Sequence, residues 1–353
     1  MESLQIRILS GCSKLKNFPE VQGQMENLSE LYLDGTAIRG LPSSIGHLNG
    51  LVLLDLTNCK QLANLPQSIC ELTSLQTLTL SGCIELKKLP DDLGSLQCLV
   101  ELNANGTAIQ EVPPCITLLS NLRVLSFAGC KGGDSMSWNL VFSFWSSPTK
   151  YLRLPSLLGL HSLESLNLSD CNLVEGALPS DLASLSSLKD LDLSRNSLII
   201  TVPASLSQLS QLKKLILEHC KSLQSLPELP SSIETLECND CTSLETFSYP
   251  LSAYALRQSG GFTFKFSNCF RMVENEHSDV LEAIVLGIQL VASIPKSLHP
   301  NKVSHLYTYI CIISNGIHTY FRILFWSAYI TYTHILFPSG IKNEMKNILH
   351  FNI

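Results

Sequence analysis

The chain has 353 residues, 45% of them hydrophobic and 15% charged, so it has the apolar content of one long or two ordinary folded domains and is not an intrinsically disordered composition. Its formal net charge of −6, with no run of Lys and Arg, argues against nucleic acid as a partner, because nucleic-acid-binding proteins present basic stripes. No secretory signal is visible at the amino end, so we expect a cytoplasmic protein whose 13 cysteines are thiols rather than disulfides.

The sequence is built from internal repeats. Segments that begin at Leu51, Leu75, Leu99 and Leu122 follow one another at intervals of 24, 24 and 23 residues. The same pattern starts at six other positions, which brings the total to about ten units: Leu4, Leu28, Leu163, Leu188, Leu212 and Ile233. Each unit opens with LxxLxL, and this alternation puts Leu78 and Leu80 on one face of a short strand and Thr79 on the other.

A Leu-Pro pair follows most of these strands, as at Leu89 and Pro90. Proline has a fixed φ and no N–H, so it suits a convex segment that enters a short helical turn and has no strand neighbour. An IxxL pattern after the proline, such as Ile45 and Leu48, returns apolar side chains to the core. Each strand can bury its leucines only by stacking on its neighbours. The units therefore predict a leucine-rich-repeat solenoid of the α/β class, with a curved parallel β-sheet and short helical or irregular convex segments.

One position in the repeat, which we call the ladder position, lies three residues after the second apolar residue of the strand. Seven cysteines occupy it: Cys12, Cys59, Cys83, Cys130, Cys171, Cys220 and Cys241. Thr36, Thr107 and Asn196 hold it in other units. These side chains are small and can satisfy backbone polar groups where the strand ends, so we expect a structural row. Cys238 and Cys241 have the spacing of a zinc half-site, but the repeat register explains both, so we predict no metal site.

Several units resemble those of one family. LYLDGTAIRGLPSSIGHL and LNANGTAIQEVPPCITLL alternate with units such as LSGCIELKKLP, and PELPSSIETLECNDCTSLE closes the array. These motifs resemble the leucine-rich-repeat region of plant TIR-NB-LRR disease-resistance proteins, and FTFKFSNCFRMVENE resembles the start of the jelly-roll and Ig-like domain that follows it there. The resemblance implies the protein-binding region of an intracellular immune receptor, which recognises pathogen effectors and restrains the receptor. No GxxxxGK[ST] loop and no catalytic constellation occurs, so we expect neither enzyme activity nor a cofactor.

The pattern also suggests domain boundaries. We expect the solenoid over residues 1–250, with an insertion loop at 131–162 where the unit spacing breaks. Residues 251–300 would be the start of the domain that follows the repeats, with a buried helix over 279–294.

The two ends of the sequence are unusual. Residues 301–353 contain ten Ile against four Leu, the reverse of the repeats, and we interpret this tail as a translated intron. A membrane span over 305–337 is the weaker alternative, because Arg322 lies near its middle. Since Met1 lies within a repeat that has no capping unit, we expect a fragment of a larger receptor or a truncated gene model.

The outward positions of the strands would form the concave face, which is free to vary and therefore suits protein binding. Acids predominate among these positions, and Arg7, Lys189 and Lys213 are among the basic residues counted there. The candidate partner-binding residues are Tyr32, Asp34, Asp55, Thr79, Glu101, Asn103, Asp190, Asp192, Arg195, Ile216 and Glu218. We expect Tyr32 and Ile216 to be exposed contacts near the two ends, and the acids to favour a protein partner with a basic surface.

That partner would be a pathogen effector or the nucleotide-binding domain of the receptor itself, and neither nucleic acid nor a membrane is expected. A secreted leucine-rich-repeat receptor-like or enzyme-inhibitor protein is the alternative, which a signal peptide or a glycan at Asn105 would favour. An enzyme is a further alternative, which NAD cleavage by the isolated chain would favour.

Overall fold

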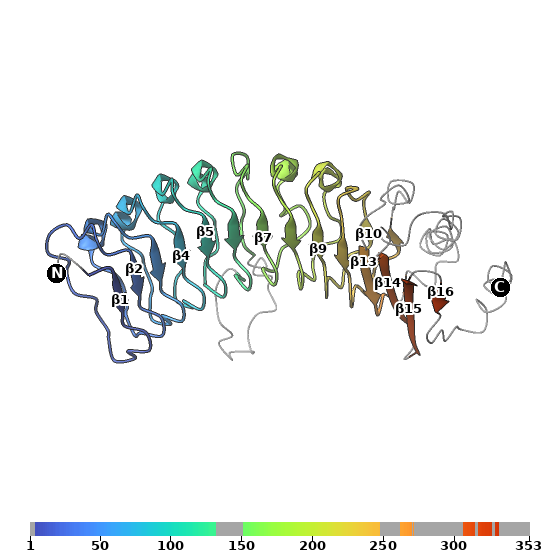
Figure 1. Cartoon of the computed structure of the whole chain (residues 1–353), viewed down its shortest axis with the longest axis horizontal. Helices are drawn as coiled ribbons and strands as arrows, with labels where there is room; N and C mark the ends of the chain where they lie inside the picture. The colour runs from blue at the N-terminus through green and yellow to red at the C-terminus, as the bar shows by residue number, and fades with distance from the viewer. Residues whose placement is uncertain are drawn as a thin grey trace, which may run out of the picture.

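The computed structural model describes residues 4–131, 151–247, 262–269, 271, 306–314, 317–326 and 329–331. Within these ranges the chain forms a 14-stranded sheet in the order β1 to β9, β11, β13, β14, β15, β16. Figure 1 shows the strands side by side along a shallow arc, with the 3-10 turns gathered along one side of it. The arrangement is that of a solenoid, in which each unit contacts mainly its neighbours.

The repeat strands are short, parallel and in register. Their bounds are β1 (Ile6–Ile8), β2 (Glu30–Tyr32), β3 (Leu53–Asp55), β4 (Thr77–Thr79), β5 (Glu101–Asn103), β6 (Val124–Ser126), β7 (Ser165–Asn167), β8 (Asp190–Asp192), β9 (Lys214–Ile216) and β11 (Thr235–Glu237). Leucine pairs with leucine from strand to strand, as in Leu54, Leu78 and Leu102. These three side chains and Leu80 are fully buried, so the predicted solenoid and its register are confirmed.

The first strand departs from the pattern. Arg7 pairs with Leu31, which puts Arg7 in the inward row and not among the outward residues as expected. Its guanidinium lies 5.5 Å from the centre of the Phe18 ring, a cation–π contact that lets a charged side chain occupy this position half-buried. Ile6 and Ile8 consequently face outward and are 46% and 67% exposed.

The convex side is made of 3-10 turns that begin after the prolines. They are η1 (Ser43–His47), η2 (Gln67–Glu71), η3 (Leu93–Ser95), η4 (Pro114–Leu118), η5 (Ser180–Ser184) and η6 (Ala204–Gln208). Pro42 precedes η1 in an extended conformation, and the N–H of Leu48 closes the turn on the carbonyl of Ile45. Three residues per turn place Ile45 and Leu48 on the same side, and both are buried, as the IxxL pattern predicts.

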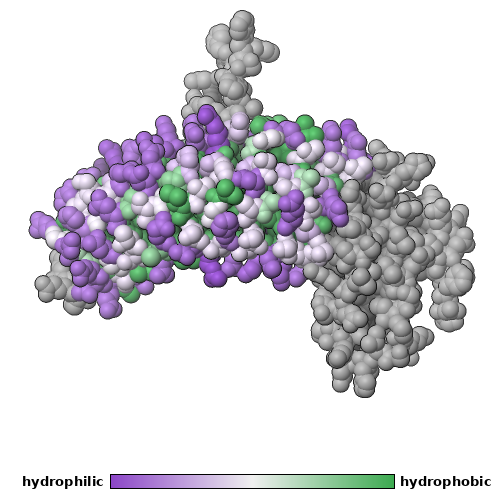
Figure 2. Space-filling model, turned by 90° about the horizontal axis from the view of Figure 1, so that it is seen from above, coloured by the Kyte–Doolittle hydropathy of each residue, from purple (hydrophilic) through white to green (hydrophobic). Residues whose placement is uncertain are grey.

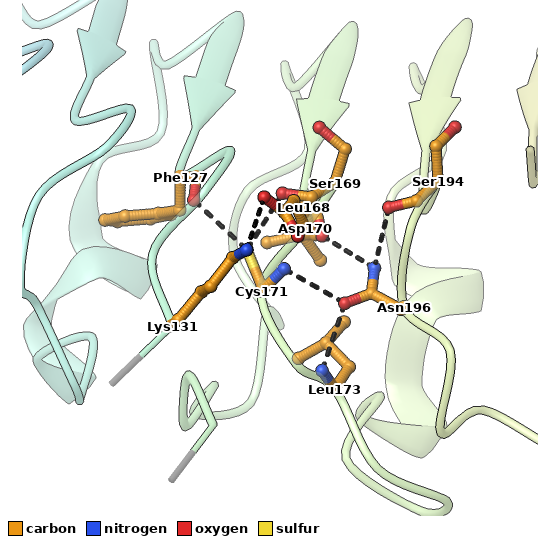
Figure 3. Close-up of polar contacts among 9 residues, drawn as sticks. All are labelled: Phe127, Lys131, Leu168, Ser169, Asp170, Cys171, Leu173, Ser194 and Asn196. Atoms are coloured by element: carbon orange, nitrogen blue, oxygen red, sulfur yellow. Dashed lines mark hydrogen bonds and ion pairs between the residues drawn. The ribbon is translucent and has the colours of Figure 1, made fainter. Parts of the chain in front are cut away.

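The ladder position connects each unit to the one before it. From Cys59 onward, each ladder thiol donates to the carbonyl of the residue that directly follows the strand of the preceding unit, as Cys171 Sγ does to Phe127 O at 3.1 Å (Figure 3). Asn196 performs the same task with a carboxamide and is fully buried. The predicted structural row is therefore confirmed, except that Cys12 is exposed because no earlier unit in the described chain covers it.

Two boundaries differ from those expected. Residues 151–162 are not part of an insertion: Leu152, Leu157 and Leu160 are fully buried, and Arg153 forms a bridge with Glu111 of the preceding unit. They complete the convex half of the unit that begins at Leu122. The remainder of the expected insertion, 132–150, lies outside the described residues.

The repeat sheet also continues past residue 250. β13 (Phe262–Ser267) pairs in parallel with β11, so that Phe264 lies beside Leu236. Cys269 then takes the ladder position, and its thiol donates to Cys238 O at 3.0 Å. The segment taken as the start of another domain therefore contributes an eleventh repeat-like strand, in which aromatic residues replace the usual leucines.

Three further strands complete the sheet. β14 (Leu306–Ser314) is parallel to β13, whereas β15 (Ile317–Trp326) and β16 (Tyr329–Thr331) continue antiparallel. A separate small sheet pairs β10 (Ser225–Leu226) with β12 (Thr246–Phe247). The helix expected over 279–294 lies outside the described residues. Within the described ranges, no helix has the length and apolarity needed to cross a bilayer.

The ladder predicts a division of thiol reactivity. Burial raises the pKa of Cys83 and of Cys220 to about 12, which keeps both thiols neutral and unreactive at neutral pH. Cys12 and Cys98 are exposed. A maleimide added to the folded protein should therefore label Cys12 and Cys98 first, and the buried ladder cysteines only after denaturation. Peptide mapping by mass spectrometry checks this order, and early labelling of Cys83 would contradict the ladder geometry.

Candidate functional site

The outward side chains of the repeat strands form aligned rows on the concave face. We call one of them the central row, because it follows the last residue of each three-residue strand across the face. From β2 to β9 it consists of Tyr32, Asp55, Thr79, Asn103, Ser126, Asn167, Asp192 and Ile216. These side chains come from units that are about 23 residues or more apart in sequence, yet neighbouring members are about 4.8 Å apart across the sheet.

Four members of the central row adopt one local geometry. A side-chain oxygen of Asp55, Asn103, Asn167 or Asp192 accepts the backbone N–H two residues further on, at distances of 2.8, 3.3, 2.9 and 2.9 Å. Short side chains with an oxygen two bonds from Cβ can make this contact where a strand ends. This hydrogen bond fixes the orientation of each side chain. The second polar atom of the side chain then points away from the backbone N–H that is bound by the first.

Several outward acids are neutralised within the face. Glu164 accepts from Arg123 at 2.8 Å and from Lys189 at 2.6 Å. The hydrogen bond from Lys189, followed by the positive charges of Arg123 and Lys189, lowers the pKa of Glu164. Glu234 pairs with Lys213 and Glu237 with Lys265. The acidic character expected from the sequence is therefore smaller than the count of acids implies.

Other acids keep their charge available. In the described part of the chain, Asp55, Glu101, Asp190 and Asp192 take part in no ion pair. Glu101 and Asp190 begin strands β5 and β8, whereas Asp55 and Asp192 belong to the central row. These four carboxylates make up the negatively charged part of the concave face, and three of them come from β5 and β8.

The remaining predicted residues also lie on or beside this face. Asp34 accepts from Ser10, and Glu218 accepts from Asn239 at 2.6 Å, so both are tied to a neighbouring unit. Tyr32 and Ile216 are half-buried and not exposed as expected. The Tyr32 hydroxyl donates to Glu30 at 2.9 Å, which raises its pKa.

Arg195 differs from the other predicted residues. It occupies the turn before the ladder position with a φ of 63°, where five other units have glycine. An arginine in this left-handed conformation is strained relative to glycine, and its side chain is exposed at the edge of the face.

Two residues of the face escaped sequence reasoning. Ser126 and Asn167 lie in the central row between Asn103 and Asp192, but neither carries a charge or a large apolar group. Counting four residues from the opening leucine of each unit would have found both. Choosing candidate residues by charge and size missed Ser126 and Asn167, because both side chains are small and uncharged.

The convex side offers less for specific binding. Seen from above, on the side of the 3-10 turns, the surface is mostly hydrophilic or intermediate, with small separate hydrophobic areas (Figure 2). Leu118 and Leu158 are each 60% exposed and are the largest apolar exposures among the convex residues described. No group of three His, Cys, Asp or Glu side chains in the described ranges is arranged to hold a metal ion.

Family models identify the class of protein. Residues 1–89 match the model described as "Disease resistance protein RPS4B-like, leucine-rich repeats", and residues 162–185 and 175–221 match two general leucine-rich-repeat models. Together with the parallel sheet and the ladder, these matches define a leucine-rich-repeat protein.

Comparison with individual proteins narrows this class. Disease resistance-like protein DSC1 of Arabidopsis thaliana is 36% identical over 268 residues, 76% of this chain and 21% of that protein. TMV resistance protein N of Nicotiana glutinosa is 40% identical over 227 residues, 63% and 18% of the two chains. Disease resistance protein RPP2B of Arabidopsis thaliana is 38% identical over 290 residues, 82% and 22%. The leucine-rich repeats of this chain are therefore similar to those of plant disease-resistance proteins, and the chain spans about a fifth of the length of these relatives.

Proposed function

We propose that the chain is the protein-binding repeat region of a cytoplasmic plant immune receptor. In this role its concave face recognises a pathogen effector or contacts the receptor's own nucleotide-binding domain to keep it inactive. The region acts by binding and not by catalysis. The observation that carries the proposal is a set of four carboxylates, Asp55, Glu101, Asp190 and Asp192, which form no ion pair within the described ranges and are held on a rigid sheet face.

The physical support comes from the contrast between the two sides of each unit. The inward side chains are fixed by the core and the ladder, so the outward ones can change without loss of fold. Uncompensated charge on such a face attracts a partner with a basic surface and increases the rate of association at low salt. The kinship with disease-resistance proteins supplies the biological context, a role in defence.

The test is charge reversal in a receptor that carries these repeats. We expect Glu101→Lys, Asp190→Lys and Asp192→Lys together to abolish recognition or to cause constitutive signalling, because the face then repels a basic partner. Cell death in leaves and the partner affinity at low and high salt are the readouts. A folded triple variant with unchanged affinity, salt dependence and signalling would contradict the proposal.

A matched control separates position from charge. Glu85, Asp91 and Glu228 are exposed acids outside the concave face, and they form no ion pair within the described ranges. Reversing these three acids changes the net charge equally. We expect this control to retain recognition and to behave like the unmodified receptor in signalling.

A further inference from the structure

Charged and uncharged polar side chains follow a regular order in the middle of the central row. From β3 to β8 its members are Asp55, Thr79, Asn103, Ser126, Asn167 and Asp192, each beside the next in the parallel register. A carboxylate therefore stands at each end of the segment, and four small uncharged polar side chains lie between them. Neither carboxylate is in an ion pair within the described chain.

The two asparagines of this segment use their oxygens, and not their amino groups, in hydrogen bonds within the described chain. A backbone N–H can only donate, so the N–H of Asn105 identifies the atom of Asn103 that it contacts as Oδ1, and the N–H of Ser169 does the same for Asn167. Each oxygen accepts a second bond from a hydroxyl, from Ser81 at 2.6 Å and from Ser169 at 2.8 Å. Both oxygens are thus fully used.

The amino groups of these side chains have no acceptor within the described chain. Asn103 and Asn167 make no hydrogen bond through Nδ2 within the described ranges, although both side chains are only half-buried and their orientation is fixed. Asn105 lies two residues after Asn103 in the same unit and uses its oxygen in a similar way. Its Oδ1 accepts from Ala128 N at 2.8 Å and from the Ser126 hydroxyl at 2.5 Å. Preorganised donors of this kind bind acceptors at little cost in side-chain entropy.

We infer that this segment of the central row binds an extended polypeptide that crosses strands β3 to β8. Backbone carbonyls in the middle of the bound segment accept from Asn103 and Asn167, and basic side chains at its two ends pair with Asp55 and Asp192. This inference rests on the proposed function, because it specifies what the concave face recognises.

The geometry sets the length of the bound segment. Five strand-to-strand steps of about 4.8 Å separate Asp55 from Asp192, about 24 Å in all. An extended chain advances about 3.3 Å per residue, and only side chains an even number of positions apart face the same way, so the two basic residues should be about eight positions apart. The residues between them should be uncharged, because a carboxylate there has no cation to pair with in this part of the row.

Synthetic peptides test the spacing on the full 353-residue chain. The probes carry two lysines separated by three, seven or eleven Ser and Thr residues, so that both lysines face the same way in an extended chain. Their ends are blocked, and their affinity is measured by fluorescence anisotropy. We expect the peptide with seven intervening residues to bind at least about threefold more tightly than the other two, because only it reaches both carboxylates while extended. Equal affinity for all three peptides, or no binding by any, would overturn the inference.

Two pairs of isosteric variants test the donors and the charges separately. Asn103→Asp with Asn167→Asp keeps the oxygens that accept from the backbone but removes the amino donors, so the peptide with seven intervening residues should bind about tenfold more weakly. Simple attraction between charges predicts the opposite, since this variant gains two negative charges. Asp55→Asn with Asp192→Asn should weaken binding about threefold or more and flatten its dependence on salt.

The results also distinguish this inference from the proposed function. Unchanged or tighter peptide binding by the Asn103→Asp, Asn167→Asp variant overturns the polypeptide inference, provided its unfolding midpoint matches that of the unmodified chain. If the Glu101, Asp190 and Asp192 reversal still alters recognition in the receptor, the concave face remains the binding surface and only the assignment of its central row fails.

Discussion

Leu80→Asp should destroy the fold of the central repeats, whereas Thr79→Asp at the neighbouring position should be tolerated. Leu80 is fully buried among the core leucines of adjacent units, and Thr79 is a half-buried outward residue of the central row. A carboxylate at position 80 would be desolvated without a cation or a donor nearby, a change we expect to cost about 4 kcal/mol or more. At position 79 the carboxylate stays hydrated, and the expected cost is below about 1 kcal/mol.

Urea denaturation followed by circular dichroism measures this difference. Because units of a solenoid are stabilised by their neighbours, we expect Leu80→Asp to lower the midpoint and also to broaden the transition as the central units unfold first. Equal destabilisation by the two substitutions would mean that the strand register is wrong. Leu80→Ala serves as a control for lost packing, with an intermediate loss of about 2 to 5 kcal/mol.

Asn196→Ala should be the most damaging substitution in the ladder. The Asn196 carboxamide donates to Leu168 O at 2.9 Å and accepts from Cys171 N and Leu173 N, both at 3.0 Å (Figure 3). It also donates to Leu193 O at 2.8 Å. Removing it leaves Leu168 O, Cys171 N and Leu173 N without these partners, whereas Leu193 O still accepts from the Cys220 thiol at 3.3 Å. Each unsatisfied group costs about 1 to 3 kcal/mol, and since relaxation recovers part of the loss, we expect a total of about 3 to 5 kcal/mol.

Asn196→Cys is the matched control, because cysteine holds this position in most other units. A thiol can restore the bond to the carbonyl of Leu168 but cannot accept from two backbone N–H groups as well. The free energy of unfolding of Asn196→Cys should therefore lie between those of the unmodified chain and of Asn196→Ala in the same denaturation assay. If alanine and cysteine were equally harmful, the hydrogen bonds to the preceding unit would not be what stabilises the ladder.

The inward half of each unit could be predicted from sequence because repetition fixes it. Leu78, Leu80 and Cys83 recur at the same spacing, and any shift by one residue would turn the leucines outward. The first strand shows where this reasoning fails, since Arg7 occupies an inward position only because the Phe18 ring lies beneath its guanidinium. That contact joins residues 11 positions apart and leaves no trace in the repeat pattern.

The outward half was only partly predictable. Counting from the opening leucine placed Asp55, Thr79 and Asn103 correctly on one face, as the register shows. Which carboxylates are neutralised depends on the side chain in the adjacent unit, as when Arg123 and Lys189 both contact Glu164. Single-unit reasoning cannot supply these contacts between units.

Aromatic substitution hid the end of the array. β13 has Phe264 and Phe266 at the two positions where most other units have leucine, so the LxxLxL pattern is absent even though Cys269 continues the ladder. A search for the ladder cysteine alone would have found this strand.

The unpaired carboxylates have a consequence for conditions of measurement. Attraction between the concave face and a basic partner acts over about one Debye length, about 8 Å at physiological salt. Affinity measured at low salt will therefore exaggerate the contribution of Asp190 and Asp192 relative to that of hydrogen bonds in the central row. Comparing the two salt conditions separates long-range attraction from contact at the row itself.

Site-directed photo-crosslinking tests most directly whether the concave face is the surface that contacts the partner. A benzophenone amino acid is placed either at position 79, on the central row, or at position 118, on the exposed convex side, in a receptor that carries these repeats. We predict that position 79 forms a crosslink to the effector or to the receptor's nucleotide-binding domain and that position 118 does not. Crosslinking from position 118 alone would contradict the account and move the binding surface to the convex side.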